Sequence, residues 1–130
     1  MAQRMHPQNK QEIIAVCDKF MDAFKKGKYT DACEYLKQYS VISDNNLDTL
    51  ATASKYQIDT GSNGFGKSVS FELISERPVK NTLIKLVYLL KFERSFLNFR
   101  FILYNNGNGW TITTLTYDGE VDDLFVTATN

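Results

Sequence analysis

Apolar residues recur at intervals of three and four over the first part of the chain, which is the pattern of an amphipathic helix. Asn9 stands three residues before Glu12, and this spacing predicts a helix start in which each side chain satisfies a free backbone amide. Gly27 predicts the helix end, because glycine adopts the left-handed conformation that stops a helix. The apolar face of this first predicted helix consists of Ile13, Val16, Cys17, Phe20 and Phe24.

Two shorter helices are predicted next. Thr30 can cap the first of them, which runs to about Tyr39 and turns Ala32, Cys33 and Leu36 inward. Ser43 or Asp44 can cap the other, which ends before Gly61. Its apolar face consists of Leu47, Leu50, Ala51, Ser54 and Ile58.

Beyond Lys67 the apolar period changes to two, which is the pattern of a strand. A first strand is predicted over 69–73, with Pro78 expected to break the run at a turn or bulge. Further strands are predicted over 79–92, 96–104 and 110–117, joined by turns at 93–95 and 105–109, and the tail is expected to lay Leu124 and Phe125 on the core. One face of the two central strands carries Ile84, Leu86, Tyr88, Leu90, Phe92, Leu97, Phe99, Phe101 and Leu103.

Helices first and strands after, joined by short hairpins, predict an α+β fold in which N-terminal helices pack on a strongly curved, four-stranded antiparallel sheet. The chain of 130 residues has the usual length of one domain. We expect a disordered or tag-like tail over 1–8 and a single domain over 9–130.

The charge balance argues against nucleic acid as a partner. Lysine plus arginine equals aspartate plus glutamate at 15 each, so the general positive field that attracts phosphate backbones is missing. The longest apolar stretch, from Leu83 to Phe92, is interrupted by Lys85 and Lys91, so we expect a soluble chain without a membrane span. The opening residues contain no apolar core of a signal peptide, although a signal trimmed before expression stays possible.

Cys17 and Cys33 are the only cysteines, and each lies on the apolar face of a predicted helix. Free buried thiols are the expectation, with a disulfide between the two helices as the alternative. A metal or catalytic role is disfavoured, because two thiols without an adjacent histidine provide too few ligands for zinc.

The segment from Gly61 to Ser68 matches the phosphate-binding pattern G-x-x-x-x-G-K-[ST]. That motif works between a strand and a helix, where the helix N-terminus and the loop amides face the phosphates. Here a helix is predicted before the loop and a strand after it. We therefore expect no nucleotide site.

Several phrases of the sequence resemble small bacterial members of the nuclear transport factor 2-like (cystatin-like fold) superfamily: FMDAFKKGKYTDACEYL, SFELISE, YLLKFE, FRFILYNNGNGW and DDLF. The resemblance covers nearly the whole chain and specifies fold rather than activity. It implies a cone-shaped sheet around the first helix, a cavity inside the cone, and a homodimer through the outer sheet face. It also favours a bacterial periplasmic or secreted location after signal removal, with the cytoplasm as the alternative.

Enzymes of this superfamily place acid–base residues in the cavity, but their pattern is not matched here. His6 precedes the first predicted helix and is expected in the tail. The carboxylates that we considered as general acids or bases, all with a natural solvated interpretation, are Asp48, Asp59, Glu72 and Glu93. We therefore assign no catalytic residue, no metal ligand and no cofactor.

Aromatic residues are the better candidates for a pocket wall, because a tyrosine ring can pack while its hydroxyl faces a wet cavity. Arg100 could meet an anionic ligand, with a surface ion pair as the alternative. The candidate pocket residues are Tyr35, Tyr56, Tyr88, Arg100, Tyr104 and Trp110.

Three functions follow from these observations. The first is a non-enzymatic domain that binds a small apolar ligand in the cone and forms a homodimer. The second is an isomerase, dehydratase or hydrolase that uses a buried carboxylate or a Tyr–Asp pair at the cavity floor. The third is a protein-interaction module that uses the outer sheet face, where Leu83, Val87 and Leu89 alternate with lysines.

Overall fold

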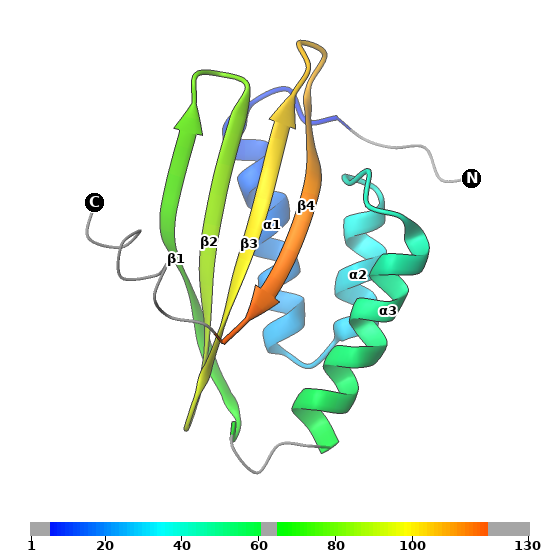
Figure 1. Cartoon of the computed structure of the whole chain (residues 1–130), viewed down its shortest axis with the longest axis vertical. Coiled ribbons are helices and arrows are strands. Elements are labelled where there is room, and N and C mark those ends of the chain that lie inside the picture. The colour runs from blue at the N-terminus through cyan, green and yellow to red at the C-terminus, as the bar shows by residue number, and fades with distance from the viewer. Residues whose placement is uncertain (1–5, 61–64, 120–130) are drawn as a thin grey trace.

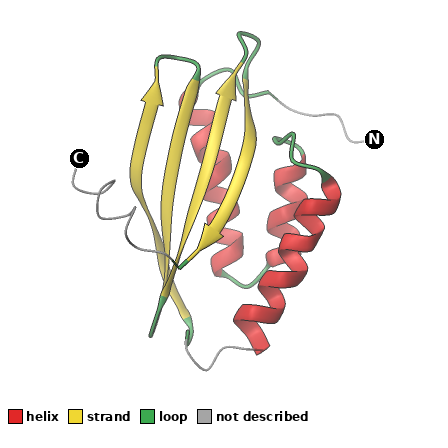
Figure 2. Cartoon of the chain, viewed as in Figure 1, coloured by secondary structure: helices red, strands yellow, loops and turns green. Residues whose placement is uncertain are grey.

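The computed structural model describes residues 6–60 and 65–119, which form an α+β fold with three α-helices and a four-stranded antiparallel sheet. Helix α1 lies across one face of the sheet. Helices α2 and α3 lie beside α1, beyond the edge strand β4 (Figure 1; Figure 2). The predicted fold class is confirmed at this level. The elements are α1 (Lys10–Lys25), α2 (Tyr29–Lys37), α3 (Asp44–Ser54), the π-helix η1 (Lys55–Thr60), β1 (Ser68–Val79), β2 (Leu83–Phe92), β3 (Phe96–Asn105) and β4 (Trp110–Asp118).

The helix ends follow the predicted caps in two of three cases. The Glu12 amide donates to Asn9 Oδ1 at 2.9 Å, and the Asn9 side-chain amide donates back to Glu12 Oε1 at 2.9 Å. Ser43 accepts from the Asn46 amide and begins α3. The predicted cap at Thr30 is wrong, because α2 begins at Tyr29 with no side-chain hydrogen bond at its cap position.

The sheet has the order β1-β2-β3-β4, with each strand antiparallel to the next. The predicted break at Pro78 is wrong: β1 continues to Val79, and the chain turns at 80–82. Pro78 pairs with Ile84 on an edge strand, where a missing N–H can face away from the ladder without loss. The predicted turns at 93–95 and 105–109 are confirmed, the latter with positive φ at Gly107 and Gly109.

The strong curvature expected from the sequence is not present, since the sheet twists but does not curl around α1 (Figure 1). The reason lies in where the strand irregularities fall. β1 carries two register shifts and β4 carries one, whereas β2 and β3 pair without interruption. Bulges bend the strand that contains them, and the described central pair has none to bend it.

The core lies between α1 and the inner face of the sheet. Phe20 packs edge-on against Phe101, and Phe24 packs edge-on against Phe99, at centroid distances of 5.7 and 5.0 Å. The inner-face residues predicted for β2 and β3 are all buried. Cys17 and Cys33 are buried free thiols, as expected.

The two ends of the sheet are tied to chain segments outside it. Pro7 accepts a hydrogen bond from the Trp110 amide at 2.8 Å, so residues 6–8 lie against the β3–β4 hairpin although the sequence placed them in a tail. Ser40 forms a parallel bridge with Ile112 beside the free edge of β4. Leu124 and Phe125 lie outside the described residues.

Candidate ligand-binding site

The largest of four hollows on the described part of the molecule lies at the lower end of the sheet in Figure 1, where α1, η1 and the β2–β3 turn meet. We call it the basal hollow. Its volume is about 730 Å³, which is within the usual range of small-molecule sites. It is lined by Phe24, Lys25, Lys26, Gly27, Tyr29, Ile58, Gly66, Lys67, Ser68, Phe92, Glu93 and Arg94.

One wall of the basal hollow is a short paired backbone segment outside the named strands. The Glu93 amide donates to the Lys67 carbonyl at 2.9 Å, and the Arg94 amide donates to the Phe65 carbonyl at 3.0 Å. Gly66 lies between the two bonds with φ of +75°, and a Cβ there would come within 2.9 Å of Glu93 Cβ. The wall therefore requires glycine at this position.

The floor of the basal hollow is aromatic and largely covered. The rings of Phe24 and Tyr29 meet at a centroid distance of 4.7 Å, and Phe92 is backed at 5.0 Å by Phe65, which does not itself line this hollow. The Ser68 hydroxyl donates to the Lys25 carbonyl at 2.6 Å, which ties the start of β1 to the end of α1. Ring contacts and a hydrogen bond between the sheet and α1 thus hold the floor in place.

The rim of the basal hollow carries four cationic side chains and one carboxylate. Lys26 forms an ion pair with Asp22 at 2.9 Å, and this pair lowers the pKa of the Asp22 carboxyl. Neither Lys25 nor Lys67 forms an ion pair with any residue that the structure describes. Their charges are therefore available to a ligand.

Part of the phosphate-like pattern lines this hollow, yet two of its polar groups are already engaged. The Lys67 amide donates to Glu93 Oε1 at 2.8 Å, and Ser68 bonds to Lys25. The pattern lies between η1 and β1, so the order is helix and then strand, as the sequence predicts. Gly61 belongs to the part of the pattern that lies outside the described residues.

The candidate pocket residues from the sequence do not come together in one hollow. Trp110 is buried at the start of β4, and Tyr35 packs on Tyr39 beneath Lys19 between α1 and α2. Burial raises the pKa of Tyr35 to about 12. Arg100 forms an ion pair with Asp118 at 3.0 Å on the outer sheet face, the alternative that the sequence analysis named.

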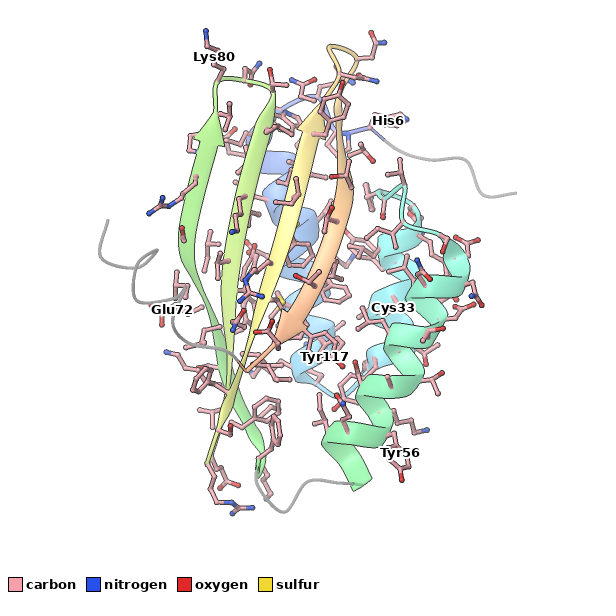
Figure 3. All side chains as sticks on the ribbon, in the orientation of Figure 1. His6, Cys33, Tyr56, Glu72, Lys80 and Tyr117 are labelled. Atoms are coloured by element: carbon pink, nitrogen blue, oxygen red, sulfur yellow. The ribbon has the colours of Figure 1, made fainter. Side chains whose placement is uncertain are left out.

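Two of the candidate tyrosines are exposed. Tyr104 lies on the outer sheet face with 39% of its surface accessible, and Tyr56 is 73% accessible on the outer side of the helical layer (Figure 3). Tyr56 and Tyr117 border a second hollow of about 630 Å³, in which the Tyr117 hydroxyl donates to Gln57 Oε1 at 3.2 Å. None of the six candidates lines the basal hollow.

Tyr88 is the candidate with the most distinctive contact. Its hydroxyl donates to Asp18 Oδ1 at 2.5 Å, with the ring buried against Phe71 and Phe101. Burial, followed by this hydrogen bond, raises the pKa of Tyr88 far above its ordinary value. A Tyr–Asp pair is what an enzyme would require, but neither side chain lines any of the four hollows compared above.

Three of the four carboxylates considered for catalysis are engaged in surface contacts, and the side chain of Asp59 lies outside what the structure describes. Glu72 pairs with Lys91 at 2.7 Å, Asp48 pairs with Lys37 at 2.8 Å, and Glu93 holds the Lys67 amide. Within residues 6–60 and 65–119 no group of three or more histidine, cysteine or acidic side chains is arranged to hold a metal ion. No helix in the same ranges is long and apolar enough to cross a membrane.

The residues of the basal hollow were missed by sequence reasoning, although one signal could have found them. In an antiparallel meander, the start of the first strand and the turn between the second and third strands lie at the same end of the sheet. Lys67 and Arg94 stand at these two positions. Lys25 and Lys26 at the end of α1 provide the other two cations of the rim.

Comparison with known proteins identifies no relative: no protein-family model matches the chain, and neither do any curated protein or solved structure.

Proposed function

We propose that this domain is a non-enzymatic binding protein that takes a small organic ligand in the basal hollow. The observation that carries the proposal is an aromatic floor together with two lysines that form no ion pair with any described residue, around about 730 Å³ of space. Ligand sites combine apolar walls with a few polar groups in this way. The Tyr88–Asp18 pair supports catalysis less well, because it lines none of the hollows described above.

We further propose that the fold is a flattened relative of the nuclear transport factor 2-like cone. Helices that precede a four-stranded meander, with α1 across its inner face, support this assignment. The resemblance implies a cavity inside the cone, between the sheet and the first helix that it surrounds. The basal hollow lies at an end of that helix–sheet layer.

A binding experiment with an uncharged aromatic probe tests the proposed site. Naphthalenemethanol titrated into isotopically labelled protein should shift the amide resonances of 24–29, 66–68 and 92–94, because these segments line the basal hollow. Lys26→Trp should abolish these shifts by filling the space. Thr52→Trp serves as the matched control, since this exposed position lines a different hollow on the outer side of α3.

The two variants separate the possible results. Binding that survives Lys26→Trp, or shifts confined to the Thr52 side of α3, would place the ligand elsewhere and refute the proposal. Far-ultraviolet circular dichroism should show the same helix content for both variants as for the unaltered protein.

A homodimer through the outer sheet face is the second candidate. Val79, Leu83 and Tyr104 are direct neighbours in the strand register and are 60%, 37% and 39% accessible. An apolar row across three strands suits a symmetric contact with a second copy. Sedimentation equilibrium should give twice the chain mass, and Leu83→Lys should halve it; a single-chain mass for the unaltered protein at high concentration contradicts the dimer.

A further inference from the structure

Among the four hollows on the described residues, the basal hollow is the one lined by positive charge. The whole sequence is balanced, with 15 basic and 15 acidic residues. The other three hollows are lined by no cationic side chain, and two of them carry one aspartate each, Asp48 and Asp118. By contrast the basal hollow has four cations around it against the single carboxylate of Glu93.

Two of these cations carry the argument. Lys25 and Lys67 form no ion pair among the residues described, whereas Lys26 is neutralised by Asp22. Lys25 is half-buried in the last turn of α1, and Lys67 is exposed next to Ser68, whose hydroxyl bonds to the Lys25 carbonyl. Both lysines line the basal hollow, so a ligand bound there can reach both ammonium groups.

The rest of the hollow argues for an organic anion rather than for phosphate alone. A phosphate site needs several backbone amides aimed at the anion. Here the Lys67 amide is occupied by Glu93, and the Ser68 hydroxyl by the Lys25 carbonyl. What the site offers is a small apolar floor, formed by Phe24, Tyr29, Ile58 and Phe92, each less than a tenth exposed, below separate lysine side chains.

We propose that the ligand of the basal hollow is a small organic anion, such as an aromatic or short-chain carboxylate, whose apolar body rests on the floor while Lys25 and Lys67 hold the carboxylate. This inference rests on the proposed binding function and names its ligand class. The carbonyl end of α1 opposes the lysines in part, which limits the gain from the charge to about tenfold in affinity.

A matched pair of probes isolates the charge. Naphthoate and naphthalenemethanol share one ring system and differ in the carboxylate. Calorimetric titration of the full chain should give about tenfold tighter binding for naphthoate. The double variant Lys25→Met, Lys67→Met keeps side-chain length and should bring the two affinities together, whereas Lys25→Arg, Lys67→Arg should preserve the difference.

Lys85→Met is the control, because this exposed lysine lies on the outer sheet face and does not line the hollow. It should leave both affinities unchanged. Added salt should weaken the binding of naphthoate and leave the binding of naphthalenemethanol unchanged. Equal affinities for the two probes in the unaltered protein overturn the anion inference while the binding proposal stands; failure of both probes to bind refutes the binding function itself.

Discussion

Gly66 shows how one backbone conformation builds the candidate site. Its positive φ lets the loop before β1 pair with Glu93 and Arg94, and this pairing forms a wall of the basal hollow. Gly27 has a similar φ of +78°, but a Cβ there would meet no atom within 4 Å. Substitution of Gly27 therefore tests the left-handed conformation alone, whereas substitution of Gly66 tests that conformation together with a steric clash against Glu93.

Alanine substitutions at these glycines should differ in effect. Gly27→Ala should lower the free energy of unfolding by about 1 kcal/mol, because only the left-handed conformation is penalised. Gly66→Ala should lower it by about 2 kcal/mol or more, because its Cβ also collides with Glu93 Cβ. Urea unfolding measures both. Equal losses would mean that the loop moves away from Glu93 without cost, and that the wall is not fixed.

At the scale of elements, the parts of the fold that could be predicted from sequence are those with a clear periodicity. The alternation of β2 and β3 predicted their buried faces because both strands pair without a bulge. The predictions at Thr30 and Pro78 are wrong for the same reason. A residue type that often caps a helix or breaks a strand can also lie inside a helix or a strand. Thr30 lies in the first turn of α2, and Pro78 lies on an edge strand.

The candidate site was less predictable than the elements around it. Tyrosines were chosen for their chemistry, and the structure disperses them over the core, the outer face and the helical layer. Lys25, Lys67 and Arg94 have no shared sequence pattern, since they meet only where three connections reach one end of the sheet. Such a meeting depends on topology, which periodicity does not encode.

At the scale of the whole molecule, buried ionisable groups make stability depend on alkaline pH. Burial raises the pKa of Cys33 from an ordinary value of 9.0 to about 12, and it raises the pKa values of Cys17 and Tyr88 further. As pH rises past the ordinary values, the unfolded chain loses these protons while the folded chain keeps them. Folding stability is therefore complete below about pH 8 and falls above about pH 9.

Urea unfolding over this range should show the decline. Each group that ionises only in the unfolded state should contribute about 1.4 kcal/mol per pH unit. Tyr88→Phe removes one such group, so above about pH 10 its curve should fall less steeply than that of the unaltered protein. A free energy of unfolding that stays constant from about pH 7 to about pH 11 would contradict the burial of these groups.

The irregularities at the two edges of the sheet have a consequence for how other chains can approach. β1 carries Pro78 and two register shifts, and β4 carries a register shift together with the bridge from Ser40 to Ile112. A foreign strand needs a regular row of free amides and carbonyls in order to extend a sheet. Neither edge strand offers a long regular row of free amides and carbonyls, so polymerisation by strand addition is opposed at both edges. Association between copies is therefore directed to the face of the sheet.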